Sequence, residues 1–175
     1  SDKPLKYNCI FCHEDIYKEY IKKDVHGIAL SNKNPMAPKC ETCHGGHNIF
    51  PLSNPKSNMS RQNQPDTCGK CHGQEEINLQ ANIIKRNLIT RYKASVHWQA
   101  IELGRPGATC TDCHGHHNIL MSSEPESKVS QVGILNTCMP CHPNDVRTFK
   151  EGAHARALVH GNLDVPNCTT CHGDH

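Results

Sequence analysis

The sequence predicts a mostly irregular and α-helical chain, with short helices, long loops and little or no strand. Only 5% of the 175 residues are aromatic and 35% are hydrophobic, while 11 are proline and 12 are glycine. A chain of this length normally needs a larger apolar core to be stable. A short motif that recurs six times, and a longer repeat built around it, indicate what takes the place of that core.

The motif is Cys-x-x-Cys-His, and its six copies use all 12 cysteines. This spacing is typical of covalent c-type haem attachment, in which two thiols form thioethers and the next histidine binds the iron. Disulfide frameworks and zinc sites also pair cysteines, but neither needs a histidine after every second cysteine. The predicted thioether cysteines are Cys9, Cys12, Cys40, Cys43, Cys68, Cys71, Cys110, Cys113, Cys138, Cys141, Cys168 and Cys171. The predicted proximal iron ligands are His13, His44, His72, His114, His142 and His172.

Six haem c groups would supply the missing core, so we predict a haem-cored fold and a largely unfolded haem-free chain. The formal charge of +2 is then misleading. Counting the haem propionates and ferric cores gives roughly −4 for the oxidised and −10 for the reduced protein. This charge argues against nucleic acid as a partner. No apolar run is long enough to cross a membrane.

Residues 40–72 align with residues 110–142 without a gap, at an offset of 70 positions. The matching segments are CETCHGGHNI with CTDCHGHHNI, and DTCGKCH with NTCMPCH. The C-terminal CTTCHGDH repeats the first part once more. We therefore predict a single hexahaem domain over residues 1–175, built as an array of three dihaem repeats. The repeats span approximately residues 9–47, 68–117 and 138–175, and polar loops 48–67 and 118–137 join them.

Helices are expected between the two haem motifs of each repeat, over residues 14–23, 75–103 and 144–160. These segments contain no internal proline, and Gly104 and Gly161 provide helix stops after the second and third. The middle segment is about twelve residues longer than the third, which predicts about three extra helical turns. On that helix Ile84, Leu88 and Tyr92 are expected to pack against a haem edge.

Eight of the 14 histidines lie outside the proximal positions. Three begin the recurring element His-x-x-Ala-(Leu/Ile), and three others follow a proximal histidine by three residues. A ligand so close to the proximal histidine cannot reach the far face of the same haem, so it must bind a neighbouring iron. The predicted distal ligands are His26, His47, His97, His117, His154 and His175. His116 and His160 are surplus, and His160 competes with His154.

The segments CxxCHGxHxI, P-x-S and TCxxCH, with the upstream His-x-x-Ala-(Leu/Ile), resemble the multihaem c-type cytochromes of metal-reducing and sulfur-cycling microbes. The resemblance covers nearly the whole chain. It extends to the decahaem conduits of outer-membrane electron-transfer complexes and to extracellular cytochromes that polymerise into filaments, or nanowires. In those filaments a histidine of one subunit often ligates a haem of the next. The resemblance therefore implies self-association, including a homopolymeric filament.

These features predict a non-enzymatic electron carrier with six bis-histidine haems in a closely spaced chain. The alternative is a multihaem reductase of nitrogen or sulfur oxyanions, which would need one open iron position. The expected partners are redox proteins or extracellular electron acceptors. Haem c is attached outside the energy-conserving membrane, so we expect a periplasmic or extracellular protein. Residues 1–4 are expected to be a mature N-terminus left after removal of a signal peptide.

Overall fold

The computed structural model describes residues 9–175, and it confirms the predicted helical class. Its described residues form helices of five to ten residues and no strand. The described chain divides into two compact units, one made of residues 9–110 with His175 and the other of residues 111–174. The expectation for residues 1–4 lies outside the described residues. None of the described helices has the length and apolar character that crossing a membrane requires.

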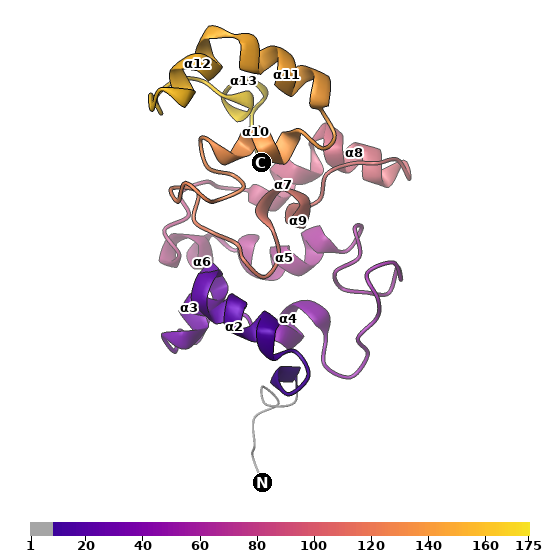
Figure 1. Ribbon diagram of the computed structural model, residues 1–175. Helices are drawn as coiled ribbons and strands as arrows, with labels where there is room; N and C mark the ends of the chain where they lie inside the picture. Colours follow the sequence, from indigo (N-terminus) through magenta and orange to yellow (C-terminus); the bar gives the residue numbers. More distant parts are fainter. Residues whose placement is uncertain (1–8) are drawn as a thin grey trace. The chain divides into compact units, whose positions relative to one another are not determined.

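The first unit is a series of short helices joined by turns and loops (Figure 1). Helix α2 packs on α3, α5 packs on α6 and α7, and α7 packs on α8. These helices are α2 (Glu14–Lys23), α3 (Val25–Ser31), α4 (Cys40–His44), α5 (Gln64–His72), α6 (Glu75–Gln80), α7 (Leu88–Lys93) and α8 (Val96–Glu102).

The second unit is also built of short helices. Helix α9 begins at Cys110, the end of the first unit, and continues into the second. Helix α11 packs against both α10 and α12. The helices are α9 (Cys110–His114), α10 (Gly133–Cys138), α11 (Pro143–Glu151), α12 (Ala153–Val159) and α13 (Cys168–His172).

The predicted helix over residues 14–23 is confirmed by α2, but the other two are broken and were wrong as single helices. Residues 81–87 separate α6 from α7, with left-handed φ angles of 56° at both Asn82 and Asn87. Asparagine tolerates this conformation better than most residues. Gly152, with extended backbone, separates α11 from α12. The longer middle segment therefore holds a loop and an additional short helix instead of three extra turns of one helix.

A seven-residue helix carries the His-x-x-Ala element at all three places where it occurs. These helices are α3, α8 and α12, and in each the histidine is the second helical residue. Each helix is followed within two or three residues by a residue with left-handed backbone. These residues are Lys33, Gly104 and Gly161, with φ of 59°, 68° and 86°. The predicted glycine stops are thus confirmed, and such an end is common for helices.

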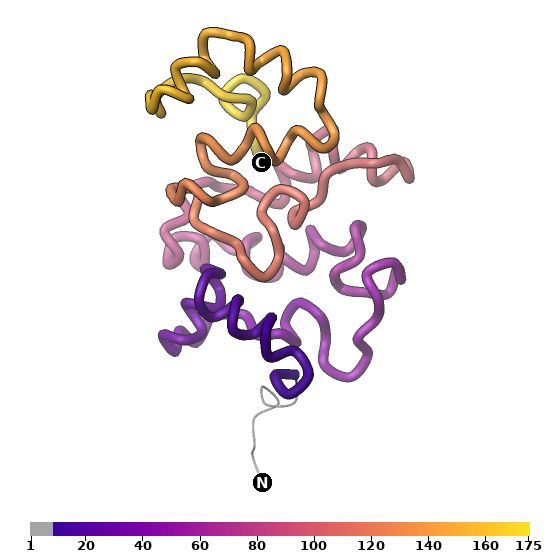
Figure 2. Tube along the Cα trace, in the orientation of Figure 1, coloured from indigo at the N-terminus to yellow at the C-terminus, as the bar shows by residue number. Residues whose placement is uncertain are grey.

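The two polar loops repeat each other in their backbone hydrogen bonds, and Figure 2 traces their winding course. In the first loop the N–H groups of Asn54, Ser57 and Ser60 each donate to the carbonyl three residues earlier, at 2.9–3.1 Å. In the second loop the residues 70 positions later, Glu124, Ser127 and Ser130, do the same at 3.0–3.1 Å. The offset found in the sequence is therefore a repeat of conformation as well.

A threonine closes each loop in the same way. The hydroxyl of Thr67 donates to the carbonyl of Asn58 at 2.7 Å, and that of Thr137 donates to the carbonyl of Lys128 at 2.6 Å. The polar loops are therefore held by local hydrogen bonds and need few apolar contacts.

Few apolar side chains are buried in the described part of the chain. One cluster joins Ile134, Leu135, Val146 and Leu158 in the second unit. Of the three residues expected to pack against a haem edge, Leu88 and Tyr92 are buried, but Ile84 is 87% exposed. The buried hydrophobic residues are Leu88, Tyr92, Ile101, Ile134, Leu135, Val146, Ala155 and Leu158. This interior is small for the chain's length, as the composition predicted.

Close contact between α2 and α3 depends on Gly27. A Cβ atom at this position would lie 2.0 Å from the carbonyl oxygen of Tyr20. We expect Gly27→Ala to force the two helices apart and to destabilise the fold by about 1–3 kcal/mol. The midpoint of denaturant unfolding, followed by far-UV circular dichroism, measures this effect.

Gly46→Ala is the matched control, because a Cβ atom there meets nothing within 4 Å. We expect its midpoint to stay close to that of the wild type. Equal midpoints for the two variants would contradict the packing of α3 on α2.

Candidate haem sites and axial ligands

Each Cys-x-x-Cys-His motif forms a single helical turn. Helices α4, α9 and α13 consist of the motif residues alone, and α5 ends on its motif. In the other two motifs the N–H of the histidine donates to the carbonyl of the first cysteine at 2.9 Å. Residues three and four positions apart share one face of a helix. The two thiols and the imidazole therefore project from the same face, as covalent haem attachment requires, and the described cysteines form no disulfide.

Consecutive motifs of the first unit are neighbours in space. The thiol of Cys40 is hydrogen-bonded to Cys9, and the thiol of Cys43 lies near Cys68 and Cys71. The thiol of Cys68 is in turn hydrogen-bonded to Cys110. Burial raises the pKa of the Cys43 thiol to about 11. The hydrogen bond with Cys110, together with burial, raises the pKa of Cys68.

The second unit shows the same arrangement. Cys113 lies near Cys141, and Cys138 is hydrogen-bonded to Cys168. Burial, with a contribution from Cys168, raises the pKa of Cys138 to about 11. Thiols with such raised pKa values are protonated and weakly nucleophilic at neutral pH.

Two predicted axial ligands meet in the first unit. The imidazole rings of His26 and His72 have centroids 5.9 Å apart and planes inclined by 61°. Two imidazoles on opposite sides of one metal ion would have centroids roughly 6 Å apart, because each metal–nitrogen bond is about 2.0 Å long and each ring centroid lies about 1 Å beyond its nitrogen. The two rings thus have a separation that suits the two axial positions of one iron.

Each of these rings is oriented by a buried polar residue. Nδ1 of His72 lies 3.3 Å from Oδ1 of Asn78, whose amide donates to the carbonyl of His72 at 2.9 Å. Nδ1 of His26 lies 3.2 Å from Oδ1 of Asp24. Both contacts engage Nδ1 and leave Nε2 as the nitrogen for a metal, an arrangement common among metal-binding histidines. Burial and the neighbouring His26 lower the pKa of His72, which favours the neutral ring that binds metals.

Sequence reasoning did not identify Asp24 and Asn78. Asp24 had a detectable signal, because it directly precedes a short helix at a position where N-cap residues are common. Asn78 follows His72 by six residues and carries no comparable signal.

The other predicted distal ligands have varied surroundings. His47 and His154 are exposed, whereas His97 and His117 are half-buried. The ring of His117 lies 5.0 Å from that of the surplus His116. His175 is grouped with the first unit, and burial together with the cations Lys85 and Arg91 lowers its pKa.

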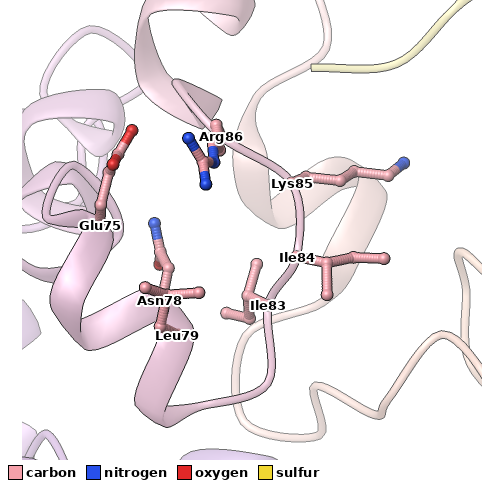
Figure 3. Close-up of a pocket in the computed structure, with 7 residues that line it drawn as sticks. All are labelled: Glu75, Asn78, Leu79, Ile83, Ile84, Lys85 and Arg86. Atoms are coloured by element: carbon pink, nitrogen blue, oxygen red, sulfur yellow. The ribbon is translucent and has the colours of Figure 1, made fainter.

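A small pocket lies beside Asn78 in the first unit. Figure 3 shows Glu75 and Asn78 of α6 on one side and Ile83 and Arg86 on the other, with Ile84 and Lys85 pointing away. The pocket encloses about 10 Å³, roughly the space that one water molecule needs. It is too small to serve as a substrate site.

A larger cavity of about 360 Å³ lies in the second unit, lined by Leu135, Lys150, Ala155, Arg156, Val159 and His160. Its apolar residues with two cations suit a haem face and its anionic propionates. Leu135 also belongs to the cluster against which Cys138 packs. His160 lines this cavity, so it remains a competitor of His154 for the nearby ligand position.

Among residues 9–175, no group of three or more His, Cys, Asp or Glu side chains could hold a metal ion. The motifs instead offer two thiols and one imidazole each, which is the set that haem c requires.

Comparison with known protein families gives a match to part of the chain. Residues 1–73 match the family described as cytochrome c7 and related cytochrome c. The matched segment contains the first three motifs and His26. Comparison with curated proteins and with solved structures finds no match. Residues 1–73 are thus similar to a family of c-type cytochromes, and the three motifs that follow this segment have the same Cys-x-x-Cys-His pattern.

Proposed function

We propose that this chain carries electrons through six covalently bound, bis-histidine haem c groups arranged in a closely spaced chain. The observation that carries the proposal is the contact between consecutive motifs. Within each unit, the thiols of one motif lie next to those of the following motif. Groups attached at neighbouring motifs would therefore be neighbours in the same order as in the sequence.

The roles of the residues follow from their chemistry. When bound, haem supplies a one-electron Fe(III)/Fe(II) couple, whose potential depends on the axial ligands and their surroundings. The twelve cysteines anchor the six groups, and the six proximal histidines hold one side of each iron. Six distal histidines close the other sides. An iron closed on both sides has no position for a substrate, which favours a carrier over a reductase.

The meeting of His26 and His72 supports one specific assignment. His72 belongs to the motif of Cys68 and Cys71, so His26 is the distal ligand of the haem attached there. This ligand comes from the helix before the second motif, so it links the first repeat to the second. We retain His47, His97, His117, His154 and His175 as the distal ligands of the other haems.

Haem stoichiometry tests the proposal. We expect the purified protein to contain six haems per chain, measured by pyridine haemochrome absorbance and by intact mass. The double variant Cys68→Ala/Cys71→Ala is expected to lose one haem and keep five. A wild-type protein with fewer than six covalent haems would contradict the proposal.

Location and assembly belong to the same proposal. The chemistry of haem c attachment supports an exported protein, periplasmic or extracellular, that exchanges electrons with redox proteins or extracellular acceptors.

We also propose self-association into a homopolymeric filament in which a histidine of one copy ligates an iron of the next. Negative-stain electron microscopy of the holoprotein tests the filament. A field of single particles alone would contradict polymerisation and leave the carrier function intact.

A further inference from the structure

The histidines of α3, α8 and α12 occupy equivalent backbone positions but have different neighbours. In each helix the N-cap residue lies two positions before the histidine and has φ between −75° and −78°. The N-cap side chain is a carboxylate in Asp24 and a hydroxyl in Ser95, and it is absent in Gly152. The N-cap residue of these equivalent helices is therefore acidic in one, a neutral hydroxyl in another and without a side chain in the third.

Asp24 is completely buried, with 0% of its surface exposed. Its Oδ1 accepts a hydrogen bond from the backbone N–H of His26 at 2.9 Å and lies 3.2 Å from Nδ1 of the same residue. Burying a carboxylate is costly unless its partners compensate. A neutral side chain can cap such a helix, because the hydroxyl of Ser95 accepts from the N–H of Trp98 at 3.3 Å. The buried charge therefore points to a role beyond capping.

We propose that Asp24 is a positioning residue that lowers the reduction potential of the haem bound at Cys68 and Cys71. The inference rests on the proposed function, in which His26 and His72 are the axial ligands of that haem. A carboxylate beside Nδ1 fixes the tautomer of a histidine ligand and makes it more basic. Its negative charge also favours ferric over ferrous iron, because the ferric form carries one more positive charge.

The same reasoning orders the haems within one chain. The haems ligated by His97 and His154 have no carboxylate at the equivalent N-cap. With other influences equal, the haem ligated by His26 has the lowest potential of the three. The different N-cap residues would thus give the haems ligated by these three helices different reduction potentials.

The first test is Asp24→Asn in the haem-loaded protein. Asparagine is an equally good N-cap, so α3 is retained while the charge is removed. We expect one of the six midpoint potentials to rise, with a change of about tenfold in the ferric-to-ferrous ratio, or about 59 mV for one electron. The electron paramagnetic resonance (EPR) g-values of one low-spin haem should change with it.

Asp15→Asn is the matched control, because it removes the same formal charge from an exposed position on α2. Its six potentials should equal those of the wild type. Circular dichroism of both variants checks that the helices remain.

The second test is Ser95→Asp, which introduces the carboxylate at the equivalent position of α8. Ser95 has φ −77° and ψ 156°, close to the φ −75° and ψ 133° of Asp24. We expect the potential of a different haem to fall by a similar amount. If Asp24→Asn fails to attach all six haems, this second variant decides the question.

Unchanged potentials in Asp24→Asn with six haems attached, or in Ser95→Asp, would overturn the inference. The proposed function would survive that result as long as the wild type holds six reducible haems. A wild type without haem at Cys68 and Cys71 would instead overturn the proposed function itself.

Discussion

A chain produced without haem is expected to lose most of its helical signal in far-UV circular dichroism. The described residues bury few apolar side chains, and the longest described helix has ten residues. Isolated helices of that length are marginal in water, so packing must supply their stability. In this chain the packing surface is proposed to come from the haem groups, and haem attachment and folding should then be coupled.

Expression in a host compartment that lacks the haem-attachment machinery provides the haem-free chain. Its spectrum and its thermal transition are compared with those of the haem-loaded protein at equal concentration. A haem-free chain that kept its helical signal and melted cooperatively would show that the protein core is sufficient without haem. That result would contradict the coupling.

The sequence predicted the helical class, one of the three expected helices and two glycine stops, because these depend on short-range signals. The helix over residues 14–23 has acidic residues in its first turn and lysines in its last, which suit the helix dipole. The glycine stops at Gly104 and Gly161 depend on single left-handed residues. The breaks at Asn82, Asn87 and Gly152 were missed, because the absence of proline does not guarantee a continuous helix.

The predicted site rests on signals of different range. The thiols and proximal histidines are predicted from spacing within five residues, so the motif alone is enough to propose them. The pairing of distal histidines depends on the path of the chain between motifs. His26 and His72 are 46 positions apart, and their meeting requires α3 and α5 to be placed by the intervening segments. The buried carboxylate of Asp24 could not be recognised before that placement, because its sequence signal is only that of an N-cap.

Replacing His26 with alanine is expected to open one iron and leave the other five closed. A ferric haem that loses a strong distal ligand becomes high-spin, so about one-sixth of the haem should appear as a high-spin EPR signal, given one open iron among six. His116→Ala is the matched control, since His116 is exposed and lies outside the six proposed distal ligands. It should leave the spectrum unchanged.

The location of the open iron is tested by combining His26→Ala with Cys68→Ala/Cys71→Ala. If His26 serves the haem attached at those cysteines, the combined variant has five haems and no high-spin signal, because the iron that His26 ligated is gone. A high-spin signal that persists in the combined variant would assign His26 to another haem. A fully low-spin spectrum in His26→Ala with six haems attached would show that His26 is not an iron ligand. The 5.9 Å approach of His26 and His72 favours the first outcome, because it is close to the separation expected of two ligands of one iron.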